Sequence, residues 1–90
     1  MTTTKLMRKK MPKPKTPLPE SNTFADRLWW LMQVHGDTVA IVSKVCHVSF
    51  RTISVYLNGH ENPKVKVVLA LADYYNVTTD FLLGRTRTPN

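Results

Sequence analysis

The stretch TVAIVSKVCHVSFRTISVYL, residues 38–57, predicts two short helices joined by a tight turn. Thr38 and Ser49 are N-cap candidates, because each hydroxyl can accept a hydrogen bond from a free backbone N–H in the turn that follows. Behind these caps, the residues of one face recur at helical spacing, at positions 39, 42, 43 and 46 and then at 50, 53, 56 and 57. The turn, Cys46-His47-Val48, is too apolar for an exposed loop, so we expect it to be packed.

The second of these helices, residues 49–57, carries polar side chains opposite its apolar stripe. This outer face is small, polar and basic, and it comprises Arg51, Thr52, Ser54 and Val55. Phe50 is ambiguous: its spacing to Ile53 favours the core or its margin, while its place at the start of the helix would allow contact with a ligand. Helix, three-residue turn, then a helix with such a face is the layout of a DNA reader.

Small, turn-forming and apolar residues extend this pattern over about two-thirds of the chain. They comprise Ser43, Val48-Ser49, Ile53, Tyr56, Asn58-Gly59, Pro63, LALADYYNV at 69–77 and DFLLG at 80–84. On these residues the chain, from about 24 to 83, resembles the Cro/repressor-like (XRE) helix-turn-helix family. The family usually has Gln where this chain has Val39, and Gly where its turn has His47. Histidine tolerates a positive φ better than most residues, so we expect the turn to form.

The resemblance implies an all-α fold, a five-helix repressor-like helix-turn-helix bundle. It also implies sequence-specific binding of double-stranded DNA, with helix 49–57 in the major groove. The protein would then be a transcriptional regulator, a repressor of bacterial or phage origin. Modules of this kind usually bind as homodimers on two half-sites about one helical turn, ~34 Å, apart.

The rest of the chain divides into an arm, a domain and a tail. Residues 1–20 hold six of the 13 basic residues, one acid and four prolines, which predicts a flexible, disordered basic arm. Residues 21–84 are expected to form one domain, with further helices at about 24–34 and 65–75 and a short helix DFLL closed by Gly84. Trp29 and Trp30 point about 100° apart, so we expect one in the core and one at its margin or in an interface. The basic segment 85–90 is predicted to be a loose tail.

The candidate contact residues fall into four groups. Arg51 is the one long donor on the outer face, and arginine to guanine is the commonest specific contact in the major groove. The predicted base contacts are Ser49, Arg51, Thr52, Ser54 and Val55. The resemblance places the segment 58–64 along the DNA backbone. The predicted phosphate contacts are Thr38, Lys44, Asn58, His60, Asn62 and Lys64. The arm would contribute Lys5, Arg8, Lys9, Lys10, Lys13 and Lys15. The candidates for a dimer interface are Trp30, Phe81, Leu82 and Leu83.

Composition narrows the choice of partner and compartment. A net charge of +7 with a pI near 9.9 suits a polyanion, either nucleic acid or an anionic membrane surface. A single cysteine excludes an intramolecular disulfide and favours the cytoplasm. Within the cytoplasm, the DNA binding that the resemblance implies would associate the protein with the nucleoid. No apolar run approaches the roughly 18 residues of a membrane span, so we expect no membrane partner. Because the carboxylates and the three histidines are dispersed, we predict no enzymatic activity, metal or cofactor.

Two other functions stay open at this point. The chain could be a protein-interaction module on a helix-turn-helix scaffold, such as an antirepressor, an antitoxin-like adaptor or an inhibitor, with weak non-specific DNA affinity. Val39, the mildly charged domain and the single arginine on the outer face favour that alternative. Binding of the arm to anionic lipid is the weaker option, because its prolines prevent an amphipathic helix.

Overall fold

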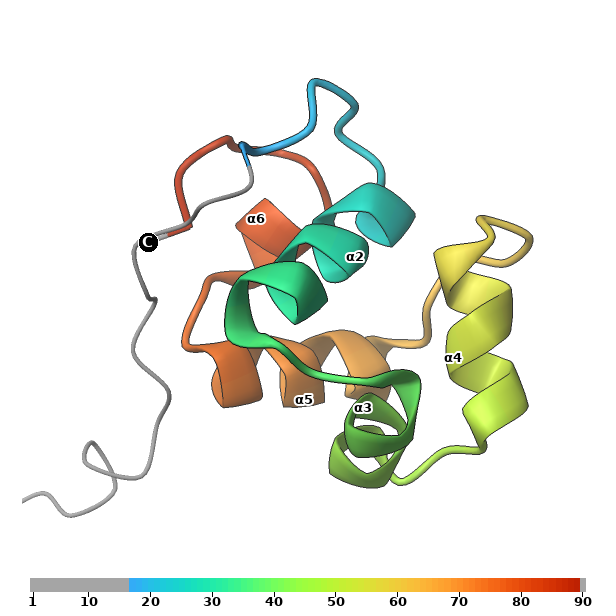
Figure 1. Ribbon diagram of the computed structural model, residues 1–90. Helices are drawn as coiled ribbons and strands as arrows, with labels where there is room; N and C mark the ends of the chain where they lie inside the picture. The colour runs from blue at the N-terminus through green and yellow to red at the C-terminus, as the bar shows by residue number, and fades with distance from the viewer. Residues whose placement is uncertain (1–16, 90) are drawn as a thin grey trace, which may run out of the picture.

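The computed structural model describes residues 17–89 and contains five helices in that range (Figure 1). They are α2 (Phe24–His35), α3 (Val39–Cys46), α4 (Phe50–Leu57), α5 (Val65–Tyr75) and α6 (Thr79–Leu82). No strand occurs among the described residues, so the predicted all-α, five-helix class is confirmed. The six basic residues of the predicted arm lie outside the described residues.

Local capping chemistry sets where the helices begin and end. The hydroxyls of Thr23, Thr38, Ser49 and Thr78 each accept a hydrogen bond from the backbone N–H three residues on, which confirms the predicted caps at Thr38 and Ser49. At their C-terminal ends, α2, α3 and α5 stop at residues in the left-handed region: Gly36, His47 and Asn76. The φ of 56° at His47 confirms that histidine can form this turn in place of glycine.

The core lies between all five helices, and α4 stands at one edge of the bundle (Figure 1). Its fully buried side chains include one or more from every helix: Leu28, Leu31, Val42, Ile53, Val67, Leu71, Tyr75, Phe81 and Leu82. Only one face of α4 reaches this core, through Ile53 and Tyr56. The arrangement therefore leaves the opposite face of α4 uncovered.

Three of the four residues predicted for a dimer interface are buried inside the domain. Phe81 and Leu82 are fully buried and Trp30 is 4% exposed, with its ring packed edge-on to Phe81 at 5.8 Å. These side chains fill the core between α2 and α6, so the prediction that they form a dimer interface is wrong. Leu83, at 47% exposure, is the one candidate that remains on the surface. Of the tryptophan pair, Trp29 is the exposed member, at 46%.

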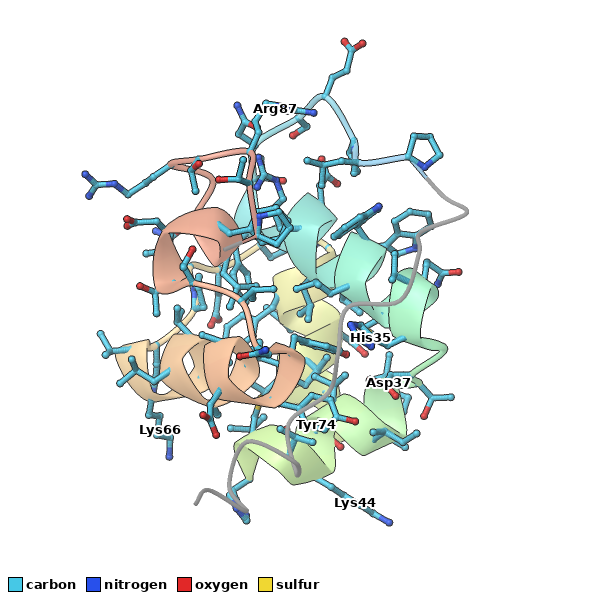
Figure 2. All side chains as sticks on the ribbon, turned by 90° about the vertical axis from the view of Figure 1, so that its left-hand side faces the viewer. His35, Asp37, Lys44, Lys66, Tyr74 and Arg87 are labelled. Carbon is cyan, nitrogen blue, oxygen red and sulfur yellow. The ribbon has the colours of Figure 1, made fainter. Side chains whose placement is uncertain are left out.

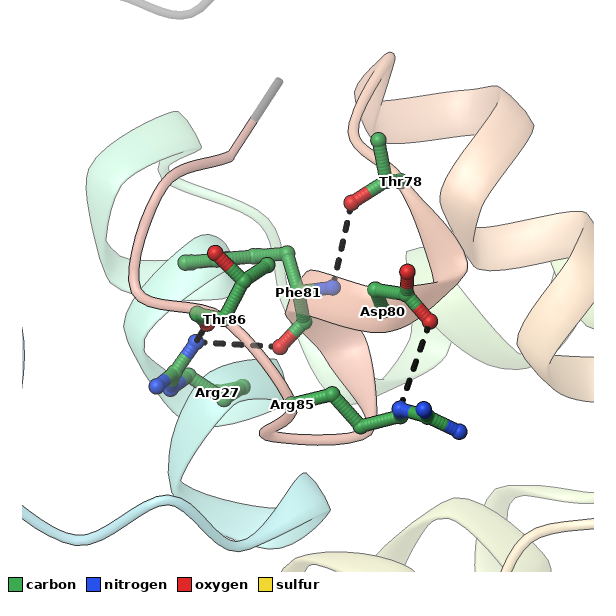
Figure 3. Close-up of polar contacts among 6 residues, drawn as sticks. All are labelled: Arg27, Thr78, Asp80, Phe81, Arg85 and Thr86. Carbon is green, nitrogen blue, oxygen red and sulfur yellow. Dashed lines mark hydrogen bonds and ion pairs between the residues drawn. The ribbon is translucent and has the colours of Figure 1, made fainter.

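Arg27 is a fully buried charged residue that the helical pattern did not reveal (Figure 3). Its Nη1 donates to the carbonyl oxygens of Phe81 and Thr86, at 3.0 and 2.8 Å. Its Nη2 donates to Asn22 Oδ1 at 2.6 Å, and the guanidinium carbon lies 4.5 Å from the centre of the Phe81 ring. Burial, with a further effect from the nearby charge of Arg87, lowers the pKa of Arg27. One side chain thus joins α2, the end of α6 and the C-terminal segment.

The C-terminal segment is held against the domain, in contrast to the loose tail that its composition suggested. The Pro89 carbonyl accepts a hydrogen bond from the Thr78 backbone N–H at 3.0 Å. Arg87 donates to the Pro19 carbonyl at 3.1 Å, the Glu20 carbonyl at 3.4 Å and Asn22 Oδ1 at 3.0 Å. Polar contacts from residues far away in sequence therefore order this segment, and composition alone does not predict them.

Replacing Gly84 by alanine is expected to destabilise the domain by roughly 1–3 kcal/mol. Gly84 has a φ of 81°, and an added Cβ would overlap the Asn22 carbonyl oxygen. Gly36 provides a matched control, since its φ is also positive, at 71°, but no atom lies within 4 Å of an added Cβ. Thermal unfolding should show a clearly larger loss for Gly84→Ala than for Gly36→Ala. Equal losses would mean that backbone strain, and not contact with Asn22, restricts position 84.

Candidate nucleic-acid interface

The exposed face of α4 is the candidate site, and its cap sets the position of the first turn. Ser49 Oγ accepts a hydrogen bond from the Thr52 backbone N–H at 3.1 Å and lies 2.9 Å from Thr52 Oγ1. On the inner side, Ile53 is fully buried and Tyr56 packs edge-on against Phe24, with ring centres 6.1 Å apart. The inner face of α4 is therefore anchored, and its outer face is presented by a rigid short helix.

The five predicted base contacts all reach solvent, to different degrees. Ser49 and Arg51 are exposed, whereas Thr52, Ser54 and Val55 are half-buried. At about 100° per residue, Arg51, Ser54 and Val55 lie together on the outer face, and Thr52 lies at the margin next to its partner Ser49. The structure thus brings four of the five side chains to one surface or its edge, while the hydroxyl of Ser49 already serves as the helix cap.

Arg51 has an environment that is unusual for an arginine. It lies in the first turn of α4, where the positive end of the helix dipole disfavours a cation. No hydrogen bond or ion pair of its guanidinium occurs among residues 17–89. A positive helix terminus carrying an unpaired guanidinium is suited to an anionic or hydrogen-bond-accepting ligand.

The predicted phosphate contacts come from α3 and its N-cap and from the segment between α4 and α5. Thr38, Lys44, Asn58, His60, Asn62 and Lys64 are all exposed. The Thr38 hydroxyl caps α3, accepting from the Ile41 backbone N–H at 3.3 Å. Lys44 extends from α3 and Lys66 from α5 on the same side of the molecule, away from its body (Figure 2). The described part of the chain therefore offers exposed cations on α3, on α4 and at the start of α5.

A cavity of about 340 Å³ lies beside the end of α4, between the start of α2 and the 58–63 loop. Asn58 and Asn62 line it, but so do the carboxyl-bearing residues Asp26 and Glu61. Two carboxylates in one small cavity repel an anion. Any contact of this loop with phosphate is therefore expected outside the cavity.

The possible reactive side chains do not form a catalytic arrangement in the described residues. Cys46 is buried, and burial raises the pKa of its thiol to about 11, so it stays protonated at neutral pH. The adjacent His47 is exposed. Tyr75 donates to Asp37 Oδ2 at 2.8 Å, and burial together with this hydrogen bond raises its pKa well above the ordinary value. This contact holds the residue just before the α3 cap and is structural. Within the described residues, no three metal-ligating side chains cluster.

The comparisons with known proteins place the chain in a family. Residues 38–82 match the family model for the helix-turn-helix domain HTH_3, a segment that begins at the α3 cap and ends with α6. The chain belongs to this XRE-type helix-turn-helix family and is a DNA-binding helix-turn-helix protein. No curated protein and no solved structure gave a significant match. In the described part of the chain, no helix combines the length and apolarity needed to cross a bilayer.

Phe50 is the residue of this surface whose position the sequence left ambiguous. Its spacing to Ile53 favoured the core or its margin, whereas its place at the start of the helix allowed contact with a ligand, and the side chain is 59% exposed. Val48, just before the cap, packs against the core instead. In a hydrophobic staple, the apolar residue before the N-cap packs against the fourth helical residue, and these positions are Val48 and Ile53 here. This pair was the feature of the sequence that could have indicated that Val48 packs at the start of the helix.

Proposed function

We propose that the protein binds duplex DNA sequence-specifically through the outer face of α4. The exposed Arg51 at the positive end of a capped, anchored helix is the observation that carries the proposal, since no partner for it exists within residues 17–89. In the major groove, its fork of donors fits guanine O6 and N7. The hydroxyl of Ser54 and the apolar Val55 on the same face can contact neighbouring base edges.

The proposed biological role is that of a transcriptional regulator, a repressor of bacterial or phage origin. Lys44 on α3 and Asn58, His60 and Lys64 between α4 and α5, all exposed, would bind phosphates and set the register of the protein on DNA. A homodimer on two half-sites remains part of the proposal. Of the predicted interface residues only Leu83 is available to it, with the exposed Trp29 as a second apolar side chain.

Selection of bound duplexes from a random DNA pool, at near-physiological salt, tests this function. Recovery of a short motif supports sequence-specific binding, and an inverted repeat with half-sites about one turn apart supports the dimer. Recovery of nothing above background, with binding that disappears as salt rises, would contradict it. The helix-turn-helix would then be better explained as a scaffold for a protein partner.

Replacing the six basic residues of the arm by glutamine is expected to weaken binding to all duplexes alike. Each lost phosphate contact makes the slope of log K against log salt shallower by about 0.9, so the full change is up to about 5. Titration of the selected motif and of a scrambled duplex at several salt concentrations measures this. The ratio between the two affinities should stay unchanged. A fall in that ratio would mean that the arm reads sequence. The substitutions leave residues 17–22 intact, which matters because Arg87 binds Pro19, Glu20 and Asn22.

A further inference from the structure

Phe50 presents a large apolar surface at a position where the fold does not require one. It is the first residue of α4 and is 59% exposed. On the helix surface it lies about 40° from the polar Ser54 and about 60° from the buried Ile53, so the ring stands at the border between the core stripe and the polar outer face. An exposed phenyl ring beside a polar outer face suits a ligand that places a small apolar group among polar ones.

Phe50 lies at the N-terminal end of α4, which is the end that recognition helices insert into the major groove. The Cα–Cβ bonds of a helix tilt toward its N-terminus, so the side chain of the first residue leans toward that end. In helix-turn-helix proteins the N-terminal residues of the recognition helix contact the base edges. Phe50 lies about 100° around the axis from Arg51 and about 40° from Ser54, at one edge of the outer face.

Only one natural base edge in the major groove carries an apolar group. Thymine exposes its C5-methyl there, whereas guanine, adenine and cytosine present hydrogen-bonding groups. We infer that Phe50 is a specificity-determining residue that packs against a thymine methyl next to the base read by Arg51. This inference rests on the proposed function, because it assigns a further contact to the same face of α4.

The test replaces single thymines of the selected motif by deoxyuridine, which removes only the methyl group. Loss of one methyl contact is expected to weaken binding by the unaltered protein roughly three- to five-fold at one thymine of each half-site. Phe50→Ala should bind the thymine and the uracil duplexes equally well at that position. The exposure of the ring makes loss of folding by this variant unexpected, and circular dichroism checks it.

Val65→Ala is the matched control. Val65 is also the first residue of its helix and is 74% exposed, but it belongs to α5. This variant should discriminate thymine from uracil as well as the unaltered protein does. Retention of the full discrimination by Phe50→Ala, or its loss in Val55→Ala instead, would overturn the inference while leaving sequence-specific binding in place. Failure of the selection to recover any motif would overturn both proposals.

Discussion

Arg51→Ala is expected to lower the affinity for the selected motif by roughly ten- to one-hundred-fold, with little effect on scrambled DNA. The guanidinium is the one long donor on the outer face of α4, and no group within residues 17–89 binds it. Its loss removes a bidentate contact to a guanine, whereas Lys44 and Lys64 would still bind phosphates. The ratio of the affinities for the motif and for the scrambled duplex should therefore fall by nearly the same factor as the affinity for the motif.

Three measurements make this prediction specific. Arg51→Lys keeps the charge and loses the planar fork, so it should recover only part of the affinity for the motif and only part of the preference. Arg85→Ala removes a charge from the exposed C-terminal segment, where Arg85 Nε lies 3.7 Å from Asp80 Oδ1, and should leave the preference unchanged (Figure 3).

The thermal midpoint should not fall in Arg51→Ala, because a cation in the first helical turn does not stabilise the helix. An unchanged preference would remove Arg51 from the base contacts.

Arg27→Met is expected to cost roughly 3–4 kcal/mol of unfolding free energy, because charge-assisted hydrogen bonds are lost and buried acceptors are left without a donor. The methionine can occupy part of the space of the aliphatic stem, but it has no donor for the Phe81 and Thr86 carbonyls or for Asn22. For a domain of this size the thermal midpoint should fall by roughly 15–25 °C. Differential scanning calorimetry measures both quantities.

Arg87→Met is the control for this substitution. Arg87 also donates to Asn22, but it is exposed, and water can replace its hydrogen bonds. Its loss should cost about 1 kcal/mol or less. Similar losses in the two variants would mean that the buried network around Arg27 adds little to stability. In that case the backbone hydrogen bonds of Thr78 with the Pro89 carbonyl and of Arg85 with the Asp80 carbonyl would contribute more to the ordering of residues 85–89.

Features set by neighbouring residues could be read from the sequence. Hydrogen bonds made within a few residues determine the helix positions, the caps at Thr38 and Ser49 and the left-handed conformation of His47. The amino-acid sequence therefore predicted these features. The helix-turn-helix class and the outward position of Arg51 followed from the same local periodicity. Which bases and phosphates these side chains contact stays a prediction.

Tertiary packing decided the features that depend on what lies opposite each side chain. Periodicity shows that Trp29 and Trp30 face different directions. It does not show which one is buried: the packing of α6 against α2 buries Trp30 together with Phe81 and Leu82. Phe50 is 59% exposed, while Val48, just before the cap, is partly buried against the core. Arg27 is buried because carbonyls brought in from the end of α6 and the C-terminal segment satisfy its guanidinium. Sequence determined the helices and their class, while contacts between distant residues determined which apolar and charged side chains remain free to act.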